Sequence, residues 1–162
     1  MQTETVEVAG TIIACEEQML VFNNLKWGAF TFPFTKLRRW QDPNFGLGFR
    51  QEEPQAAAIR AASEILGHTF AETEWPRLQH EVTEYRQSDA DGIWKLYHLH
   101  LFGMTLPAKP PTLGAGLQTE WLTVAELRAR KPVSSTVRYL LACLEEQGKL
   151  PPWKQAVTRS GA

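Results

Sequence analysis

The strongest constraint on the fold is a set of five residues at fixed spacing between Gly46 and Gly67. Five residues separate Gly46 from Glu52, seven separate Glu52 from Arg60, and Glu64 precedes Gly67 by three positions. Residues four apart on a helix share a face, so Arg60 and Glu64 are expected to lie one turn apart on the same side. The spacing therefore predicts a glycine-containing loop that leads into a charged helix.

The helix itself is predicted from Gln55 to Leu66, where helix-forming residues dominate. Pro54 stands where a first helical turn tolerates proline, and Gly67 is placed to end the helix. The expected apolar stripe consists of Ile59, Ala62, Ile65 and Leu66.

Strands are predicted before this helix. β-Branched and small residues favour strands at 6–15 and 18–22, joined by a polar turn. Phe30, Phe32 and Phe34 alternate with other residues, so their rings are expected to share one face. The segment 39–51, which is rich in glycine, proline and asparagine, is expected to be a loop.

Two more strands and two helices are predicted after the helix 55–66. The strands 79–86 and 94–104 are joined through Asp91-Gly92, a strong hairpin signal. Thr123 and Glu126 form a capping box that opens a short helix, and a striped final helix ends near residue 148. This order of strands, helix, strands and helices predicts an α+β fold, an α/β sandwich with a mixed central β-sheet.

Length and composition favour one domain. The chain of 162 residues suffices for one core, with residues 1–150 as a single domain and 151–162 as a C-terminal tail. A net charge of −1 argues against nucleic acid and anionic membranes as partners. No apolar run approaches membrane-spanning length, and no leader is recognised. The two cysteines, Cys15 and Cys143, suggest no disulfide framework, so a cytoplasmic protein is expected.

The spacing from Gly46 to Gly67 resembles the box of the Nudix hydrolase superfamily. That box has a glycine, five residues, a glutamate, seven residues, and then Arg-Glu-apolar-x-Glu-Glu-x-Gly-apolar. The segment 120–127 also resembles the one that opens the last helix of many Nudix domains. The resemblance covers roughly residues 5–148 and implies a Nudix-like α/β/α sandwich around a mixed sheet, in a family with many homodimers.

The box is degenerate. Ala61 and Ile65 stand where the family has glutamates, so Glu64 remains on that helix face with help from Glu52. Mg²⁺ prefers oxygen ligands and commonly takes one or two carboxylates together with substrate phosphates and water. The resemblance therefore implies a weak Mg²⁺ site at Glu64 and Glu52, and Glu64 with Arg60 as the catalytic candidates.

Two functions follow from this resemblance. The first is a module that binds a nucleoside-diphosphate-type ligand or a protein partner, with weak or no hydrolysis. The alternative is an active Mg²⁺-dependent pyrophosphohydrolase that cleaves a nucleoside diphosphate linked to another moiety. Its rearranged metal site would use Glu64, Glu52 and either Glu120 or a histidine from the second half of the chain.

Further ligand-binding candidates lie outside the box. Lys36 and Arg38 can neutralise phosphates, although a solvated basic turn explains them equally well. Phe34 and Trp27 can stack on a nucleobase or pack in the core. Glu120 is included as a ligand-binding candidate. The resemblance implies a ligand cleft beside the helix 55–66, and the loop 109–116 is either a lid over this cleft or a simple connector.

Two histidines of the predicted strand 94–104 are further candidates for a binding role. His98 and His100 lie on one face of their strand, where they can contact a metal or phosphate or serve as partly buried structural residues. His80 joins them only if the hairpin register places it opposite. Whether the pair faces the cleft is left open by the sequence.

Overall fold

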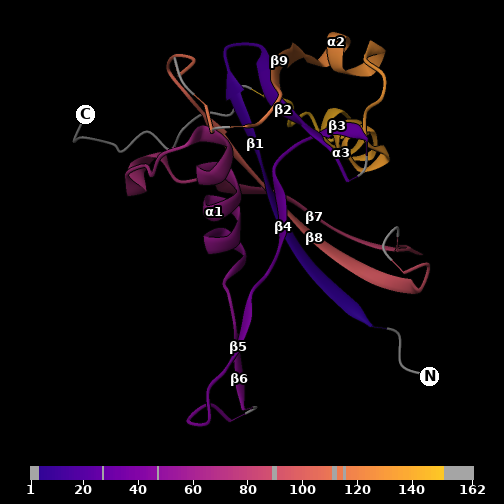
Figure 1. Ribbon diagram of the computed structural model, residues 1–162. Coiled ribbons are helices and arrows are strands. Elements are labelled where there is room, and N and C mark those ends of the chain that lie inside the picture. The colour runs from indigo at the N-terminus through magenta and orange to yellow at the C-terminus, as the bar shows by residue number, and fades with distance from the viewer. Residues whose placement is uncertain are drawn as a thin grey trace.

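The computed structural model describes residues 4–26, 28–46, 48–88, 91–110, 113–114 and 116–151 (Figure 1). The expectations for Trp27, for most of the tail and for three positions of the loop 109–116 lie outside these ranges. The elements in chain order are β1 (Thr5–Cys15), β2 (Gln18–Asn24), β3 (Ala29–Thr31), β4 (Phe34–Lys36), β5 (Arg39–Gln41), β6 (Phe49–Gln51), α1 (Pro54–Leu66), η1 (Glu72–Glu74), β7 (Arg77–Gln87), β8 (Trp94–Thr105), β9 (Thr119–Thr123), α2 (Val124–Ala129) and α3 (Ser135–Glu146). None of the described helices has the length and apolar character that crossing a membrane requires.

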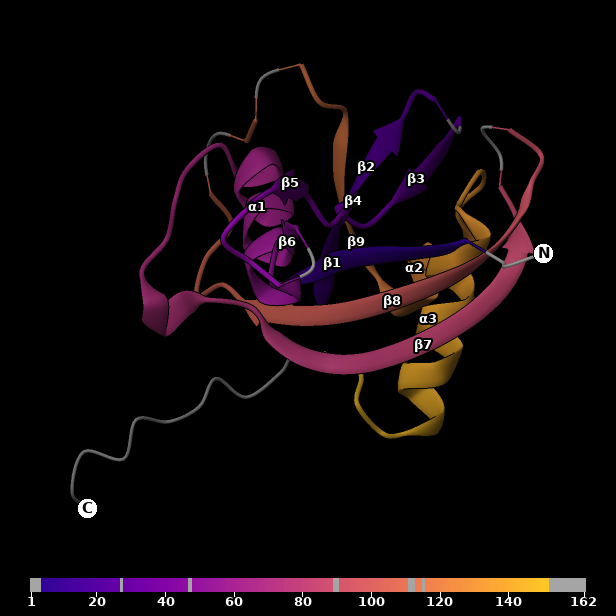
Figure 2. The ribbon, with the colours of Figure 1, turned by 90° about the horizontal axis from the view of Figure 1, so that it is seen from below.

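The main sheet is mixed, as predicted. Its strand order is β3-β2-β1-β8-β7, with β4 also paired to β1 and β9 also paired to β2. The β1–β8 pairing is parallel, whereas β7–β8, β1–β4 and β2–β9 are antiparallel. Figure 2 shows β7 and β8 from below as a long curved pair with β1 beside β8.

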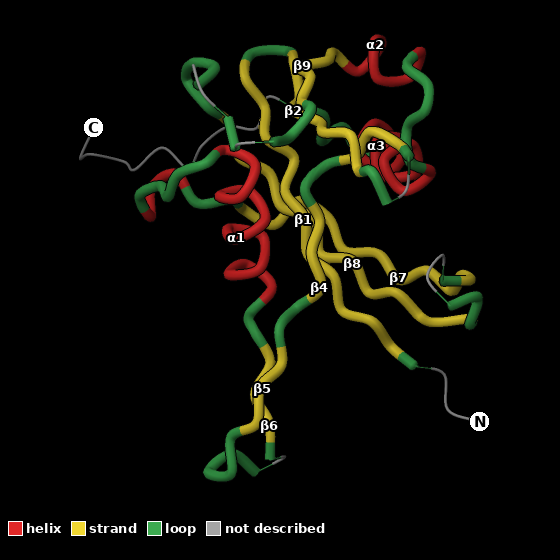
Figure 3. The backbone as a smooth tube through the Cα atoms, in the orientation of Figure 1, coloured by secondary structure: helices red, strands yellow, loops and turns green. Residues whose placement is uncertain are grey.

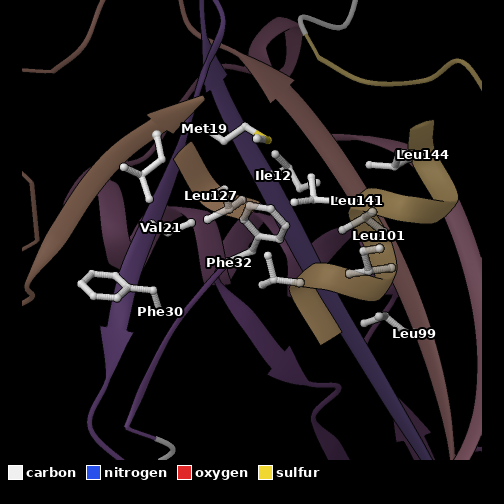
Figure 4. Close-up of a cluster of buried hydrophobic side chains, with 13 residues drawn as sticks. Ile12, Met19, Val21, Phe30, Phe32, Leu99, Leu101, Leu127, Leu141 and Leu144 are labelled. Carbon is white, nitrogen blue, oxygen red and sulfur yellow. The ribbon is translucent and has the colours of Figure 1, made fainter. Parts of the chain in front are cut away.

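Helices cover both faces of this sheet. Ile12 points to the face covered by α2 and α3, in a core with Phe32, Leu101 and Leu141 (Figure 4). Ile13, the next residue of β1, points to the opposite face and packs with Ile65 of α1 and its neighbours. Alternation along β1 thus separates an α1 face from an α3 face, and the α/β/α arrangement is confirmed.

The local signals at helix ends are confirmed. Gly67 ends α1 with φ 75°, a left-handed conformation that glycine adopts without steric cost. The Thr123 hydroxyl accepts a hydrogen bond from the Glu126 amide, and the Glu126 carboxylate accepts one from the Thr123 amide. The buried stripe of α1 differs from the predicted one because alanines fill much of it: Ala57, Ala58, Ala61, Ala62, Ile65 and Leu66.

The prediction of a loop at 39–51 was wrong. β5 and β6 form a separate antiparallel hairpin in which Trp40 pairs with Arg50. This hairpin extends away from the sheet, below the start of α1 (Figure 3). Gly46 lies within its connecting turn, so the first glycine of the box is part of the hairpin and precedes α1 by a full strand.

Candidate functional site

Glu52 and Arg60 form a double ion pair at the side of α1. The Arg60 guanidinium donates through Nη2 to Oε1 of Glu52 at 2.8 Å and through Nε to Oε2 at 3.2 Å. The Arg38 amide donates a third hydrogen bond to Oε1 at 3.0 Å. The Arg60 hydrogen bonds, only partly opposed by burial, hold the pKa of Glu52 below its ordinary value.

The same arginine ties α1 to β4. Its Nη1 donates to the Thr35 hydroxyl at 3.0 Å, and its Nη2 donates to the Lys36 carbonyl at 3.1 Å. Arg60 therefore fixes the backbone of β4 relative to the helix. A neutral side chain does not offer the five N–H donors with which a guanidinium makes all these contacts at once.

Glu64 lies on the other side of the Arg60 guanidinium. Its carboxylate is 4.0 Å from Nη1, and its side chain is 68% exposed, whereas the Glu52 side chain is 13% exposed. The positive guanidinium is thus in contact with both carboxylates. A divalent ion that used Glu52 and Glu64 together would have to overcome repulsion from this charge.

Ala61 and Ile65 are packed into the protein. They are 4% and 2% exposed, and Ile65 packs against the apolar side chains Ile13, Leu20, Leu66, Met104 and Leu106. The Gly114 amide donates to the Ile65 carbonyl at 2.8 Å, so a loop covers the end of the helix there.

These surroundings do not fit a multi-ion Mg²⁺ site, which requires several converging oxygen ligands. Ala61 and Ile65 supply no oxygen, and Glu52 is held by Arg60. Within the described parts of the chain, neither Glu52 nor Glu64 belongs to a group of three or more His, Cys, Asp or Glu side chains close enough to share a cation.

A cavity of about 380 Å³ lies on the α3 face of the sheet. Six elements contribute to its wall, and its lining residues are Val8, Asn24, Lys26, Phe34, Thr35, Lys36, Val82, Glu84, Arg86, Ser88, Tyr97, Leu99 and Thr136. Two of the predicted ligand-binding residues, Lys36 and Phe34, are among them. The other two, Arg38 and Glu120, are not.

Cationic and aromatic side chains converge at this cavity. Lys26, Lys36 and Arg86 contribute positive charge to its wall, part of which Glu84 offsets at 3.8 Å from Nε of Arg86. The Arg86 guanidinium also lies 4.2 Å from the centre of the Tyr97 ring. Phe34 reaches the wall across Gly10, where an added Cβ would be 1.8 Å from its ring. The cavity thus combines charge for an anion with ring faces for a planar group.

Glu120 has a separate partner. Its carboxylate accepts a hydrogen bond from Nη2 of Arg130 at 2.5 Å. This ion pair joins β9 to the end of α2. The structure therefore does not bring Glu120 together with the Glu52–Arg60 pair or with the cavity wall.

His98 and His100 do not face the cavity. Tyr97 and Leu99, which alternate with them along β8, line it, so the two imidazoles point to the α1 face. His80 pairs with Leu101 and contacts Gln147 at 3.3 Å, outside the His98–His100 pair. The sequence analysis did not identify Lys26, Arg86 and Tyr97, because only tertiary folding brings the turn after β2 together with β7 and β8.

Comparisons with known proteins define the fold. No family model and no curated protein matches the sequence. Among solved structures, a MutT protein from Methanosarcina mazei matches with a TM-score of 0.64 at 13% identity, over 92% of this chain and 99% of that one. The Nudix domain of Shewanella oneidensis NrtR, solved with ADP ribose, matches with a TM-score of 0.61 at 12% identity, over 91% and 90% of the two chains.

A third structure is a bifunctional NMN adenylyltransferase/ADP ribose pyrophosphatase from Francisella tularensis, solved with AMP and a Mn ion. It matches with a TM-score of 0.61 at 12% identity, over 90% of this chain and 42% of that one. Likenesses at such low identity establish the fold alone. The chain has the Nudix fold.

Proposed function

We propose that this protein binds a nucleoside-diphosphate derivative in the cavity between β4, β7 and β8, with weak or no hydrolysis. The observation that carries the proposal is the apolar packing of Ala61 and Ile65 on a helix whose Arg60 still positions β4. The packing removes ligands that metal-dependent cleavage needs, while the arginine contacts preserve one wall of the cavity.

The cavity suits such a ligand in size and chemistry. Its volume of about 380 Å³ lies within the usual range for small-molecule sites. Lys26, Lys36 and Arg86 can pair with diphosphate oxygens, and the Tyr97 and Phe34 rings can stack on a base. Two proteins of the same fold, solved with ADP ribose and with AMP, support this ligand class.

Efficient hydrolysis is not expected from the described box. Of the two glutamates at the family's box positions, Glu52 is held by Arg60 and Glu64 is exposed, and a single carboxylate with ligand phosphates makes a weak Mg²⁺ site. The removal of oriented groups of this kind commonly lowers rates by orders of magnitude.

Calorimetry with ADP-ribose, with and without Mg²⁺, tests binding. We expect Lys36→Ala to weaken binding at least about tenfold because a charge-assisted hydrogen bond contributes about 1.5–3 kcal/mol. Arg38→Ala is the matched control: its side chain is exposed and is not part of the cavity wall, so affinity should stay within about twofold. Absence of binding to ADP-ribose, dinucleotides and sugar nucleotides would refute the proposal.

A phosphate-release assay with Mg²⁺ and Mn²⁺ addresses the alternative function. We expect little turnover of any nucleoside diphosphate compound. Efficient cleavage that Glu64→Gln abolishes would instead support a true pyrophosphohydrolase that uses this exposed carboxylate.

A further inference from the structure

Four ionisable side chains from three strands meet on the α1 face of the sheet. Glu7 of β1 is in register with His98 of β8, and Glu81 of β7 is in register with His100 of β8. All four point to the face opposite the cavity, just beyond Ala9 and Phe102, on which the first turn of α1 packs.

Each imidazole lies between the two carboxylates. Oε2 of Glu7 is 2.8 Å from Nε2 of His100 and 3.0 Å from Nδ1 of His98. Oε1 of Glu81 is 2.9 Å from Nδ1 of His100 and 3.4 Å from Nε2 of His98. The two ring centres are 4.1 Å apart.

Two neutral imidazole rings cannot supply hydrogens for all four contacts. A neutral imidazole carries one N–H, and an ionised carboxylate carries no donor. Two neutral rings therefore supply donors for two contacts, and the other two would bring a nitrogen lone pair against a carboxylate oxygen. A positive centre beside one of the carboxylates removes this conflict.

We propose that Glu7, His98 and His100 bind a divalent transition-metal ion, for which Zn²⁺ is the best match. Imidazole nitrogen and carboxylate oxygen are both common Zn²⁺ ligands, with bonds of about 2.0–2.2 Å. The three ligand atoms, one from each side chain, lie within 4.8 Å of one another. A tetrahedral ion separates its ligand atoms by roughly 3.3 Å, so small side-chain rotations suffice.

When the ion is bound, Glu81 accepts hydrogen bonds from both histidines without itself contacting the metal. With Nδ1 of His98 and Nε2 of His100 on the ion, the remaining N–H of each ring donates to Glu81. This carboxylate–histidine–metal arrangement orients imidazole ligands in known metal sites. The ion also balances the two carboxylate charges, which leaves the set neutral.

The position distinguishes this site from the box and from the nucleotide cavity. The His100 side chain is 9% exposed and Glu7 is 27% exposed, so the site is partly buried but reachable from solvent. Glu52, Glu64 and the cavity-lining residues take no part in it. Its test is therefore independent of the proposed nucleotide binding.

Titration of the chelator-treated 162-residue chain with Zn²⁺ tests the site. We expect one equivalent to bind and to raise the thermal midpoint. Glu7→Gln and His100→Gln should each weaken binding roughly 100-fold or more, and Glu81→Gln about 10–100-fold. His68→Gln, at an exposed histidine outside the sheet, is the matched control and should leave the affinity unchanged.

Histidine NMR of the wild type gives a readout that does not depend on variant folding. Of the four histidines, Zn²⁺ should shift the ring signals of His98 and His100 and leave those of His68 and His80 in place. No stoichiometric binding, or binding that survives both Glu7→Gln and His100→Gln, would overturn the proposal.

Discussion

Arg60 contacts two glutamates whose surroundings differ. Glu52 lies 2.8 Å away and is largely shielded from solvent, whereas Glu64 lies 4.0 Å away and is mostly exposed. An exposed ion pair is screened by water and salt and contributes little to stability. A shielded partner is costly to remove, because it leaves a charge that solvent cannot fully compensate.

We therefore expect Glu52→Gln to lower the free energy of unfolding by about 1–3 kcal/mol. Glu64→Gln, the matched change on the same arginine, should stay within about 0.5 kcal/mol of the wild type. Urea unfolding at pH 7 measures both. Equal losses for the two variants would contradict the assignment of Glu52 as the main partner of Arg60.

The pH dependence of the free energy of unfolding is a second test of the Glu52–Arg60 ion pair. Since the pKa of Glu52 is lowered in the folded protein, its contribution is complete above the unfolded value of about 4.3. The contribution is lost as the pH falls through the folded pKa. The stability difference between the wild type and Glu52→Gln should accordingly shrink below about pH 4.

At the scale of elements, the antiparallel pairing of β4 with β1 forms one wall of the cavity. Gly10 pairs with Phe34, and the phenylalanine ring lies where a side chain on residue 10 would be. Arg60 holds the following residues of β4 from the other side. The Phe34 ring can therefore occupy its place in the cavity wall only because residue 10 is a glycine and has no Cβ.

Gly10→Ala should destabilise the protein by about 1–3 kcal/mol, since the new Cβ would meet Cδ1 of Phe34 at 1.8 Å. Displacement of the ring should also weaken ADP-ribose binding. Gly46→Ala is the control: an added Cβ there contacts nothing within 4 Å, so we expect a change below about 0.5 kcal/mol. Combining Gly10→Ala with Phe34→Leu should be clearly non-additive in urea unfolding.

Stability is unevenly distributed over the whole molecule. The central strand β1 pairs with three other strands and is buried from Ala9 to Cys15. The β5–β6 hairpin forms its own two-stranded sheet, with largely exposed residues, and extends from the body of the protein (Figure 3). Segments with few buried contacts open without global unfolding.

Native-state hydrogen exchange should reveal this difference. Amides of β1 and β8 are expected to exchange only through global unfolding, because their hydrogen bonds lie between two helical layers. Amides of Arg39–Gln41 and Phe49–Gln51 should exchange much faster, with little dependence on overall stability. Protection of the hairpin equal to that of β1 would show that it docks on another surface.

The sequence predicted α1, its glycine stop, the Thr123–Glu126 capping box and the β7–β8 hairpin because each depends on residues close together in the chain. The register of that hairpin was not predicted: a two-residue Asp91-Gly92 turn would pair residue 81 with residue 102, whereas Gln87 pairs with Trp94 and Glu81 with His100. The β5–β6 hairpin was missed because its strands are short and surrounded by turn-forming residues.

Local chemistry thus determined the elements of this protein: side-chain periodicity, caps and turn residues act over a few positions and can be read from the chain. Tertiary structure decided which elements meet when they lie far apart in the chain. The parallel pairing of Glu7 with His98 spans 91 residues, and the cavity needs Lys36, Arg86 and Tyr97 from three strands. Such contacts depend on the packing of helices against both faces of the sheet, which no short segment specifies by itself.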